Sequence, residues 1–158
     1  MDSTAKIYLQ RALNEISAAK LLFTISNNSA KKQEFQIEEE TTFYSSVISH
    51  SYYAIFYGAK AYLIKKGMKF SEQGQHQAVY YAFRKFVRQG KIAAELLELY
   101  EEVKVKADML LEILEKEEEN RTKFTYKTLA QANKAPADES IKNAEIFLNE
   151  IKGLIGKN

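Results

Sequence analysis

The chain contains only two histidines, His50 and His76. Imidazole titrates near neutral pH and binds metals, so these two residues are the first candidates for chemistry. There is no H-x-x-H or H-E-x-x-H spacing and no cysteine, so we expect no metal site. We interpret His50 as a partly buried, hydrogen-bonded residue. His76, at the start of a predicted helix, is interpreted as a capping or surface residue.

The ten tyrosines are the second unusual feature. Tyr53 and Tyr57 are four residues apart, as are Tyr52 and Phe56, which predicts two aromatic faces on one helix. Aromatic faces can stack nucleobases, and phenol hydroxyls can bind phosphate. More often such rings fill a core while the hydroxyl finds one polar partner. We favour core packing, with a dimer interface as an additional role.

The segment ENRTKFTYK places Arg121, Lys123 and Lys127 around Tyr126, just after a run of glutamates. An arginine beside a tyrosine can grip a phosphate. Alternatively, these cations complement a helix C-terminus, which the residues alone favour. No glycine-rich phosphate loop and no serine–histidine–acid arrangement can be identified.

The totals describe one ordinary domain. A length of 158 residues with 46% hydrophobic and 28% charged residues is enough for a substantial core. A formal net charge of +2 does not indicate nucleic acid or an anionic membrane as an obligatory partner. No apolar run approaches the roughly 20 residues that span a bilayer, and the N-terminus lacks a signal-type apolar segment. We therefore expect a cytoplasmic protein without a membrane segment or cofactor.

Residues 41–67 are predicted to form the central helix of an all-α, up-and-down bundle. Apolar residues occupy much of its girth, so several neighbours should cover it. Lys60 is its first charge after Glu40, unless His50 is protonated. Gly67 should end it with a left-handed cap.

Four other helices should surround this one. They are expected to run from Ser3 or Thr4 to Ile25, over about 75–89, from near Ala93, and from around Ala137. Residues 26–40 and 125–136 are predicted connections, with Pro136 just before or within a first turn. The residues expected on the buried faces are Leu9, Ala12, Leu13, Ile16, Ala19, Phe23, Val79, Phe83, Phe86, Val87, Leu96, Tyr100, Val103, Ala107, Leu110, Leu114, Ile141, Ala144, Phe147, Leu148 and Ile151.

Three segments resemble the HEPN domain family, the higher-eukaryote and prokaryote nucleotide-binding family. SHSYYAIFYGAKAYLIKKG is similar to its S-R-A-Y-Y-A-x-F-x-A-A-K-A-L-L-x-x-K-G signature. GQHQAVYYAFRKFVRQGKI is similar to its H-S-x-V-x-x-x-F-x-K-x-F-V-K-x-G-K-I stretch, and AEIFLNEIKGLI to its closing helix. The resemblance covers nearly the whole chain in the right order and implies the HEPN fold over residues 1–158.

What the resemblance implies for function has two forms. Many members are small proteins paired with a minimal nucleotidyltransferase, whereas others are dimeric ribonucleases with an arginine, four to six residues, then a histidine. Here Arg121 could be that arginine, but Tyr126 and Lys127 stand where the histidine would fall. RTKFTY instead resembles an R-x-x-A-D-Y variant. Residues 104–109 also resemble that motif, beginning at Lys104, but we prefer Arg121.

We therefore expect a non-catalytic HEPN protein, forming a homodimer and working with a separately encoded minimal nucleotidyltransferase. Arg121, Lys123 and Tyr126 would contact the phosphate of a nucleotide or RNA. These contacts would lie in a cleft. The residues expected to support the cleft or the dimer are His50, Tyr52, Tyr53, Tyr57 and His76. The alternative is a ribonuclease toxin with an atypical site, using Arg121 and either Tyr126 or His50.

Overall fold

The structure, a computed structural model, describes residues 3–120 and 134–157, and within them the side chains of residues 3–110 and 134–157. In these ranges all regular secondary structure is helical, which confirms the all-α prediction. The helices are α1 (Ser3–Ser26), α2 (Ser29–Glu34), α3 (Tyr44–Lys65), α4 (Gln75–Arg88), α5 (Ala94–Asn120) and α7 (Lys134–Gly156).

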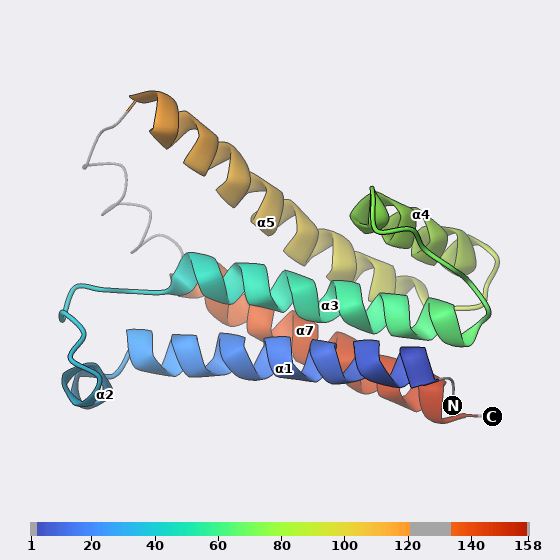
Figure 1. Cartoon of the computed structure of the whole chain (residues 1–158), viewed down its shortest axis with the longest axis horizontal. Helices are drawn as coiled ribbons and strands as arrows, with labels where there is room; N and C mark the ends of the chain where they lie inside the picture. The colour runs from blue at the N-terminus through green and yellow to red at the C-terminus, as the bar shows by residue number, and fades with distance from the viewer. Residues whose placement is uncertain (1–2, 121–133, 158) are drawn as a thin grey trace.

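Helix α3 is the centre of the bundle, as predicted. It contacts α1, α4, α5 and α7. In Figure 1, α1 lies along one side of α3, whereas α4 and α5 lie along the other. Residues 58–63 of α3 are buried without interruption, so no face of this stretch is left to solvent. Continuous burial explains why the apolar residues of α3 do not follow one stripe.

The ends of α3 follow from local chemistry. The helix begins at Tyr44 rather than at the predicted residue 41. At its other end Gly67 has φ +86°, and its N–H donates to the carbonyl of Ile64 at 2.9 Å. The N–H of Met68 donates to the carbonyl of Leu63 at 3.1 Å. These two bonds form a Schellman cap, which confirms the left-handed cap predicted at Gly67.

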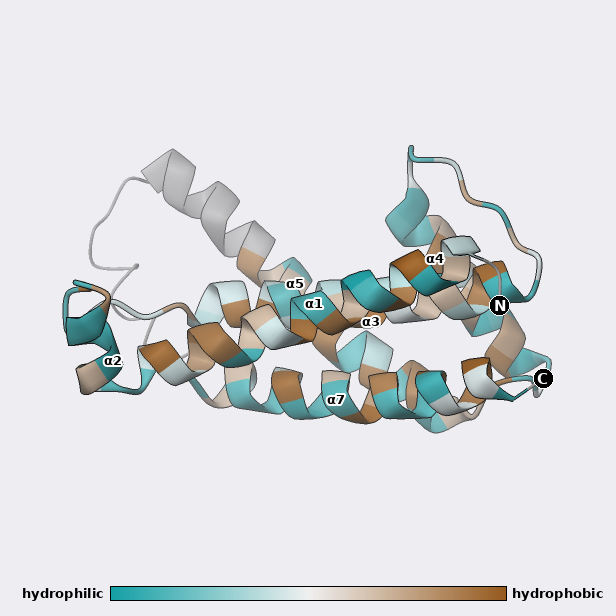
Figure 2. Ribbon diagram, turned by 60° about the horizontal axis from the view of Figure 1, so that its bottom comes forward, coloured by the Kyte–Doolittle hydropathy of each residue, from teal (hydrophilic) through white to brown (hydrophobic). Residues whose placement is uncertain are grey.

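Two other boundaries differ from the predictions. The predicted connection 26–40 contains the short helix α2, which is mostly hydrophilic in Figure 2. Asn28 caps the start of α2, because its side-chain oxygen accepts the N–H of Lys31 at 3.0 Å. Helix α7 begins at Lys134, so Pro136 lies within its first turn, where proline is tolerated.

The predicted buried faces are confirmed wherever side chains are described, since each of those residues is buried or half-buried. Only Leu114 falls outside that set. The core contains a buried aromatic cluster of Phe83, Tyr100 and Phe147, contributed by α4, α5 and α7. The ring centroids of Phe83 and Phe147 are 5.5 Å apart, and that of Tyr100 lies 5.7 Å from Phe83.

Helices α3 and α7 approach closely at Gly58. A Cβ atom added there would lie 2.7 Å from Cδ2 of Leu148 and 3.5 Å from Cε1 of Phe147. Only glycine fits without moving Leu148, so this close packing depends on the missing side chain.

Candidate functional site

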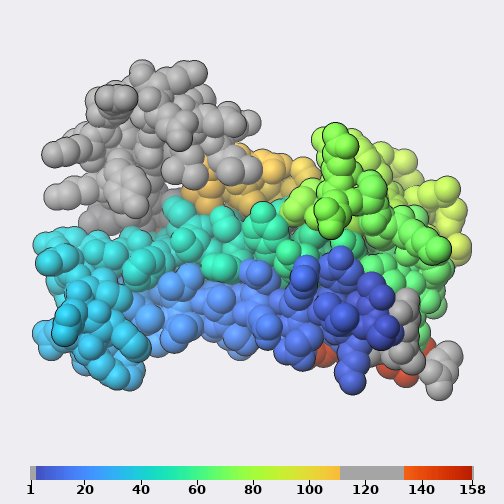
Figure 3. Space-filling model, viewed as in Figure 1, coloured from blue at the N-terminus to red at the C-terminus, as the bar shows by residue number. Residues whose placement is uncertain are grey.

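The predicted phosphate-binding residues Arg121, Lys123 and Tyr126 lie outside the described residues. The other predicted site residues are described, and four of them meet on one side of α3. These form an open aromatic cluster with one residue of α1, Tyr8. Its members are Tyr8, Tyr52, Tyr53, Tyr57 and His76. Figure 3 shows α3 reaching the molecular surface between α1 and α4.

His76 is packed into this cluster and is not the plain capping or surface residue that the sequence suggested. Its ring stacks on Phe56 with centroids 4.0 Å apart and an angle of 13° between the planes. Tyr53 meets it edge-on at 5.5 Å. Its Nδ1 lies 3.0 Å from the hydroxyl of Tyr52. Helix α4 therefore begins with a side chain that joins it to α3.

The environment keeps the Tyr52–His76 pair neutral. Burial, and next the Lys60 ammonium, lower the pKa of His76 below its ordinary value. Burial, with smaller contributions from Asp108 and Tyr53, raises the pKa of Tyr52 to about 12. With both groups neutral, one hydrogen bond joins them, and the tautomer of His76 decides whether the Tyr52 hydroxyl or Nδ1–H is its donor. Such a pair serves packing and hydrogen bonding rather than proton uptake at neutral pH.

The outer part of the cluster is open to solvent. Tyr53 is 38% exposed, and Tyr57 and Tyr8 are half-buried. The rings of Tyr8 and Tyr57 stack with centroids 6.0 Å apart, and Tyr53 lies 6.0 Å from Tyr57. The exposed guanidinium of Arg11 lies 5.4 Å from the Tyr8 centroid and 5.8 Å from that of Tyr57. Partly exposed rings beside a cation can stack a base and attract its phosphate.

His50 lies apart from this cluster. Its Nδ1 is 2.5 Å from the Oε2 atom of Glu15, which ties α3 to α1. The imidazole is half-buried, so the predicted partly buried, hydrogen-bonded histidine is confirmed. A carboxylate in this position fixes the orientation of the ring.

Lys104, the alternative start of the family motif, lies on α5. Its ammonium is 2.9 Å from the carboxylate of Asp108, one helical turn away, and 5.5 Å from the ring centroid of Tyr80. This is an ion pair of the kind common on helix surfaces.

Two classes of site find no support in the described ranges. No group of three or more histidine, aspartate or glutamate side chains is arranged there to hold a metal ion. Within the same ranges, none of the helices combines the length and apolar character needed to cross a bilayer.

The sequence interpretation missed Tyr8 and Arg11. They are three residues apart on α1 and therefore share a face, which is a detectable signal. What the sequence does not show is that this face meets Tyr57. The sequence interpretation also treated Lys60 only as an isolated charge. A single cation in an otherwise apolar helix already indicates a buried lysine that needs polar partners.

Fold and site together define an all-helical bundle with an aromatic face between its first and central helices. The sequence pattern of the HEPN domain matches residues 19–154. The chain is also 34% identical over 111 residues to a protein of Thermotoga maritima named UPF0332 protein, covering 70% of this chain and 71% of that protein. No solved structure matches significantly. The chain belongs to the HEPN domain family, as its signature residues predicted.

Proposed function

We propose that this chain is a non-catalytic HEPN protein that binds a nucleotide or RNA and works with a separately encoded minimal nucleotidyltransferase in a toxin–antitoxin-like pair. The observation that supports ligand binding is the open aromatic cluster with Arg11 beside it. The rings of Tyr53 and Tyr57 are partly accessible, and the Arg11 guanidinium lies 5.8 Å from the Tyr57 centroid.

The open aromatic cluster and Arg11 could each contribute to the free energy of RNA binding. Stacking one base on an aromatic side chain contributes about 1–3 kcal/mol, largely independent of sequence. An arginine at the edge of the stack adds a salt-dependent attraction to phosphate. With a formal net charge of only +2, the whole chain attracts polyanions weakly, so affinity should depend on these few contacts.

Arg121, Lys123 and Tyr126 remain the proposed phosphate contacts, and a homodimer remains the proposed assembly. By the family resemblance, Tyr126 and Lys127 stand where the family's ribonucleases carry histidine. A phenol with an ordinary pKa near 10 is a poor proton acceptor at neutral pH, so we propose binding without RNA cleavage.

The binding proposal is tested by fluorescence anisotropy with a labelled single-stranded RNA at fixed salt. Tyr53→Ala and Arg11→Ala should each weaken binding about tenfold, the loss expected for one stacked base or one phosphate contact. Tyr81→Ala is the matched control, because Tyr81 is also an exposed tyrosine but lies outside the cluster. Equal affinity of the wild type and both cluster variants would contradict the proposal.

The partner is tested separately. The chain should co-purify with a minimal nucleotidyltransferase encoded beside it when both are expressed together. Co-expression that gives no complex would remove the partner from the proposal and leave ligand binding to the first experiment.

The paired His50 and Glu15 favour a second candidate, an atypical ribonuclease. A carboxylate-oriented imidazole could act as a general base even without the family's usual histidine. Purified protein incubated with cellular RNA in the presence of a chelator should leave the RNA intact if the leading proposal holds. Cleavage that disappears in both Arg121→Ala and His50→Gln would establish the enzyme instead.

A further inference from the structure

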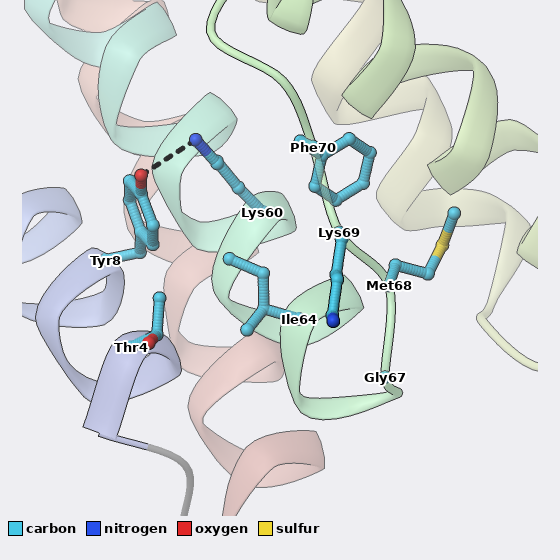
Figure 4. A pocket seen from close by; sticks show the side chains of 8 residues that line it. All are labelled: Thr4, Tyr8, Lys60, Ile64, Gly67, Met68, Lys69 and Phe70. Atoms are coloured by element: carbon cyan, nitrogen blue, oxygen red, sulfur yellow. Dashed lines mark hydrogen bonds between the residues drawn. The ribbon is translucent and has the colours of Figure 1, made fainter.

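A pocket of about 420 Å³ lies at the end of the bundle where α1 begins and α3 ends. Its walls come from α1, α3 and the segment that follows Gly67, as Figure 4 shows. This volume is in the range of sites that hold small organic molecules. The lining side chains that carry the argument are Tyr8, Lys60, Ile64, Met68, Lys69 and Phe70.

Lys60 is a buried cation in the wall of this pocket. It is only 5% exposed. Its ammonium donates to the hydroxyl of Tyr8 at 2.9 Å and to Oε1 of Gln75 at 2.6 Å. It also lies 4.0 Å from the ring centroid of Tyr8. All of these partners are neutral.

Among the described residues, the charge of Lys60 is therefore not matched by an anion. Within residues 3–110 and 134–157, no carboxylate forms an ion pair with it. Burying a charge is costly unless an opposite charge compensates for it. An ammonium has three donors, and Tyr8 and Gln75 take two, which leaves one for a ligand.

The rest of the pocket adds a second cation and an apolar surface. Lys69 lines the same space, and none of the lining residues that the structure describes is acidic. Ile64, Met68 and Phe70 supply apolar contacts for the body of a ligand. The complementary molecule has one oxyanion end and one apolar or aromatic end.

We infer that this pocket binds a small organic anion, a phosphate monoester or a carboxylate, whose oxygen accepts the remaining N–H of Lys60. The charge-assisted bond offsets the burial of the ammonium, and the apolar body contacts Ile64, Met68 and Phe70. The inference does not depend on RNA binding at the open aromatic cluster, where Tyr53 and Arg11 carry the proposal.

Methionine methyl NMR tests this binding directly. Met68 lines the pocket, whereas Met109 is an exposed residue of α5 and serves as an internal control. Phenyl phosphate, benzoate and the neutral benzyl alcohol are the probes. At least one anion should shift the Met68 methyl signal saturably without moving that of Met109. No shift with either anion, or equal binding of benzyl alcohol, would overturn the inference.

The two anions also identify the ligand class. Tighter binding of phenyl phosphate supports a phosphate monoester, and tighter binding of benzoate supports a carboxylate. Either result supports the pocket.

Substitutions show whether Lys60 is responsible. Lys60→Met keeps the length of the side chain but removes the charge, and it should weaken anion binding at least tenfold. Lys60→Arg should retain most of it. The control is Lys66→Met, since Lys66 is an exposed lysine of the same region and should not affect binding. If Lys60→Met does not fold, Lys69→Met should still weaken binding severalfold. Unchanged binding in a folded Lys60→Met variant would overturn the inference.

RNA affinity measured on these same variants separates the two proposals. Loss of anion binding with unchanged RNA affinity is the expected result. Loss of RNA binding together with loss of anion binding in folded Lys60→Met would contradict the independence of the two sites.

Discussion

The molecule contains two aromatic clusters with opposite surroundings. In the buried aromatic cluster, Phe83, Tyr100 and Phe147 are completely enclosed, and other rings are their neighbours. In the open aromatic cluster, Tyr8 and Tyr57 lie near the Arg11 guanidinium, and Tyr53 and Tyr57 partly face solvent. Tyr52 joins the two, since its ring lies 6.5 Å from that of Tyr100. The same residue types stabilise the fold in one place and present a surface in the other.

The position of each cluster relative to α3 explains this difference. The first cluster is enclosed by α4, α5 and α7 together with α3, whose Gly58 packs against Phe147. The second lies where α3 emerges between α1 and α4 (Figure 3). Ring stacking alone therefore does not distinguish a buried core cluster from a binding surface. The two are distinguished by the exposure of the rings and by the presence of neighbouring cations.

Truncating a ring should have very different costs in the two clusters. Phe147→Ala should lower the free energy of unfolding by about 3–5 kcal/mol, because it leaves a cavity among enclosed rings. Tyr53→Ala should change it by less than about 1 kcal/mol, because the side chain is already partly in solvent. Urea denaturation of both variants measures the difference. Similar losses would show that the open cluster is also part of the structural core.

Packing beside Phe147 should be equally sensitive to added volume. Gly58→Ala brings a methyl group against Leu148, whereas the methyl group of Gly153→Ala meets nothing within 4 Å. Both changes gain about 1 kcal/mol of helix propensity, so their difference isolates the overpacking. We expect Gly58→Ala to be less favourable by about 1–3 kcal/mol in denaturant unfolding. Equal effects would mean that Leu148 moves aside freely.

The hydroxyl groups of Tyr100 and Tyr80 should contribute to stability with opposite signs. Tyr100 is fully buried, and its hydroxyl has no hydrogen-bond partner among the described residues. Tyr100→Phe should therefore raise the unfolding free energy by about 1 kcal/mol, since it removes an unpaired buried group. Tyr80→Phe should lower it by a similar amount, because the Tyr80 hydroxyl donates to Glu101 at 2.7 Å. Destabilisation by Tyr100→Phe would indicate a partner for that hydroxyl.

The smallest effect should be a pH dependence from the open cluster. Burial and Lys60 lower the folded-state pKa of His76 below its unfolded value near 6.5. Its contribution to stability is therefore complete above pH 6.5 and is lost as pH falls from there through the folded-state pKa. His76→Gln should flatten the decline in stability between pH 7 and 5, measured by thermal unfolding at several pH values. His50→Gln should retain the contribution of His76; an unchanged slope in His76→Gln would contradict the assignment.

Much of the fold could be predicted from local patterns. The spacing of apolar residues identified the buried faces of all five long helices, and Gly67 identified a helix end, because these signals lie within a few residues of each other. Helix α2 was missed because its six residues, SAKKQE, are too few and too polar to show an apolar period. Its one clear signal is Asn28, a residue type that caps helices but is also common in turns and connections.

The candidate site was predicted less completely, because it depends on contacts between distant segments. The spacing of Tyr53 and Tyr57 identified one face. The other contacts depend on how α1, α3 and α4 pack against one another. These contacts are the stacking of Tyr8 on Tyr57 and the hydrogen bonds of Lys60 to Tyr8 and Gln75. The interpretation of His76 was wrong for the same reason. Its position at a helix start does not show that its ring stacks on Phe56 of another helix.

The end of α3 also connects the Lys60 pocket to the last helix, α7. The ammonium of Lys65 donates to the backbone carbonyl of Lys157 at 3.0 Å and to that of Ile155, at the close of α7. Ile155 lies in the last turn of α7, where backbone carbonyls have no intrahelical partner, so the Lys65 ammonium acts as a cap there. Fraying of the final turn of α7 would therefore loosen the neighbouring residues Gly67 and Met68. Amide hydrogen exchange near residue 155 should slow when a ligand occupies the pocket, so a distant segment would report its occupancy.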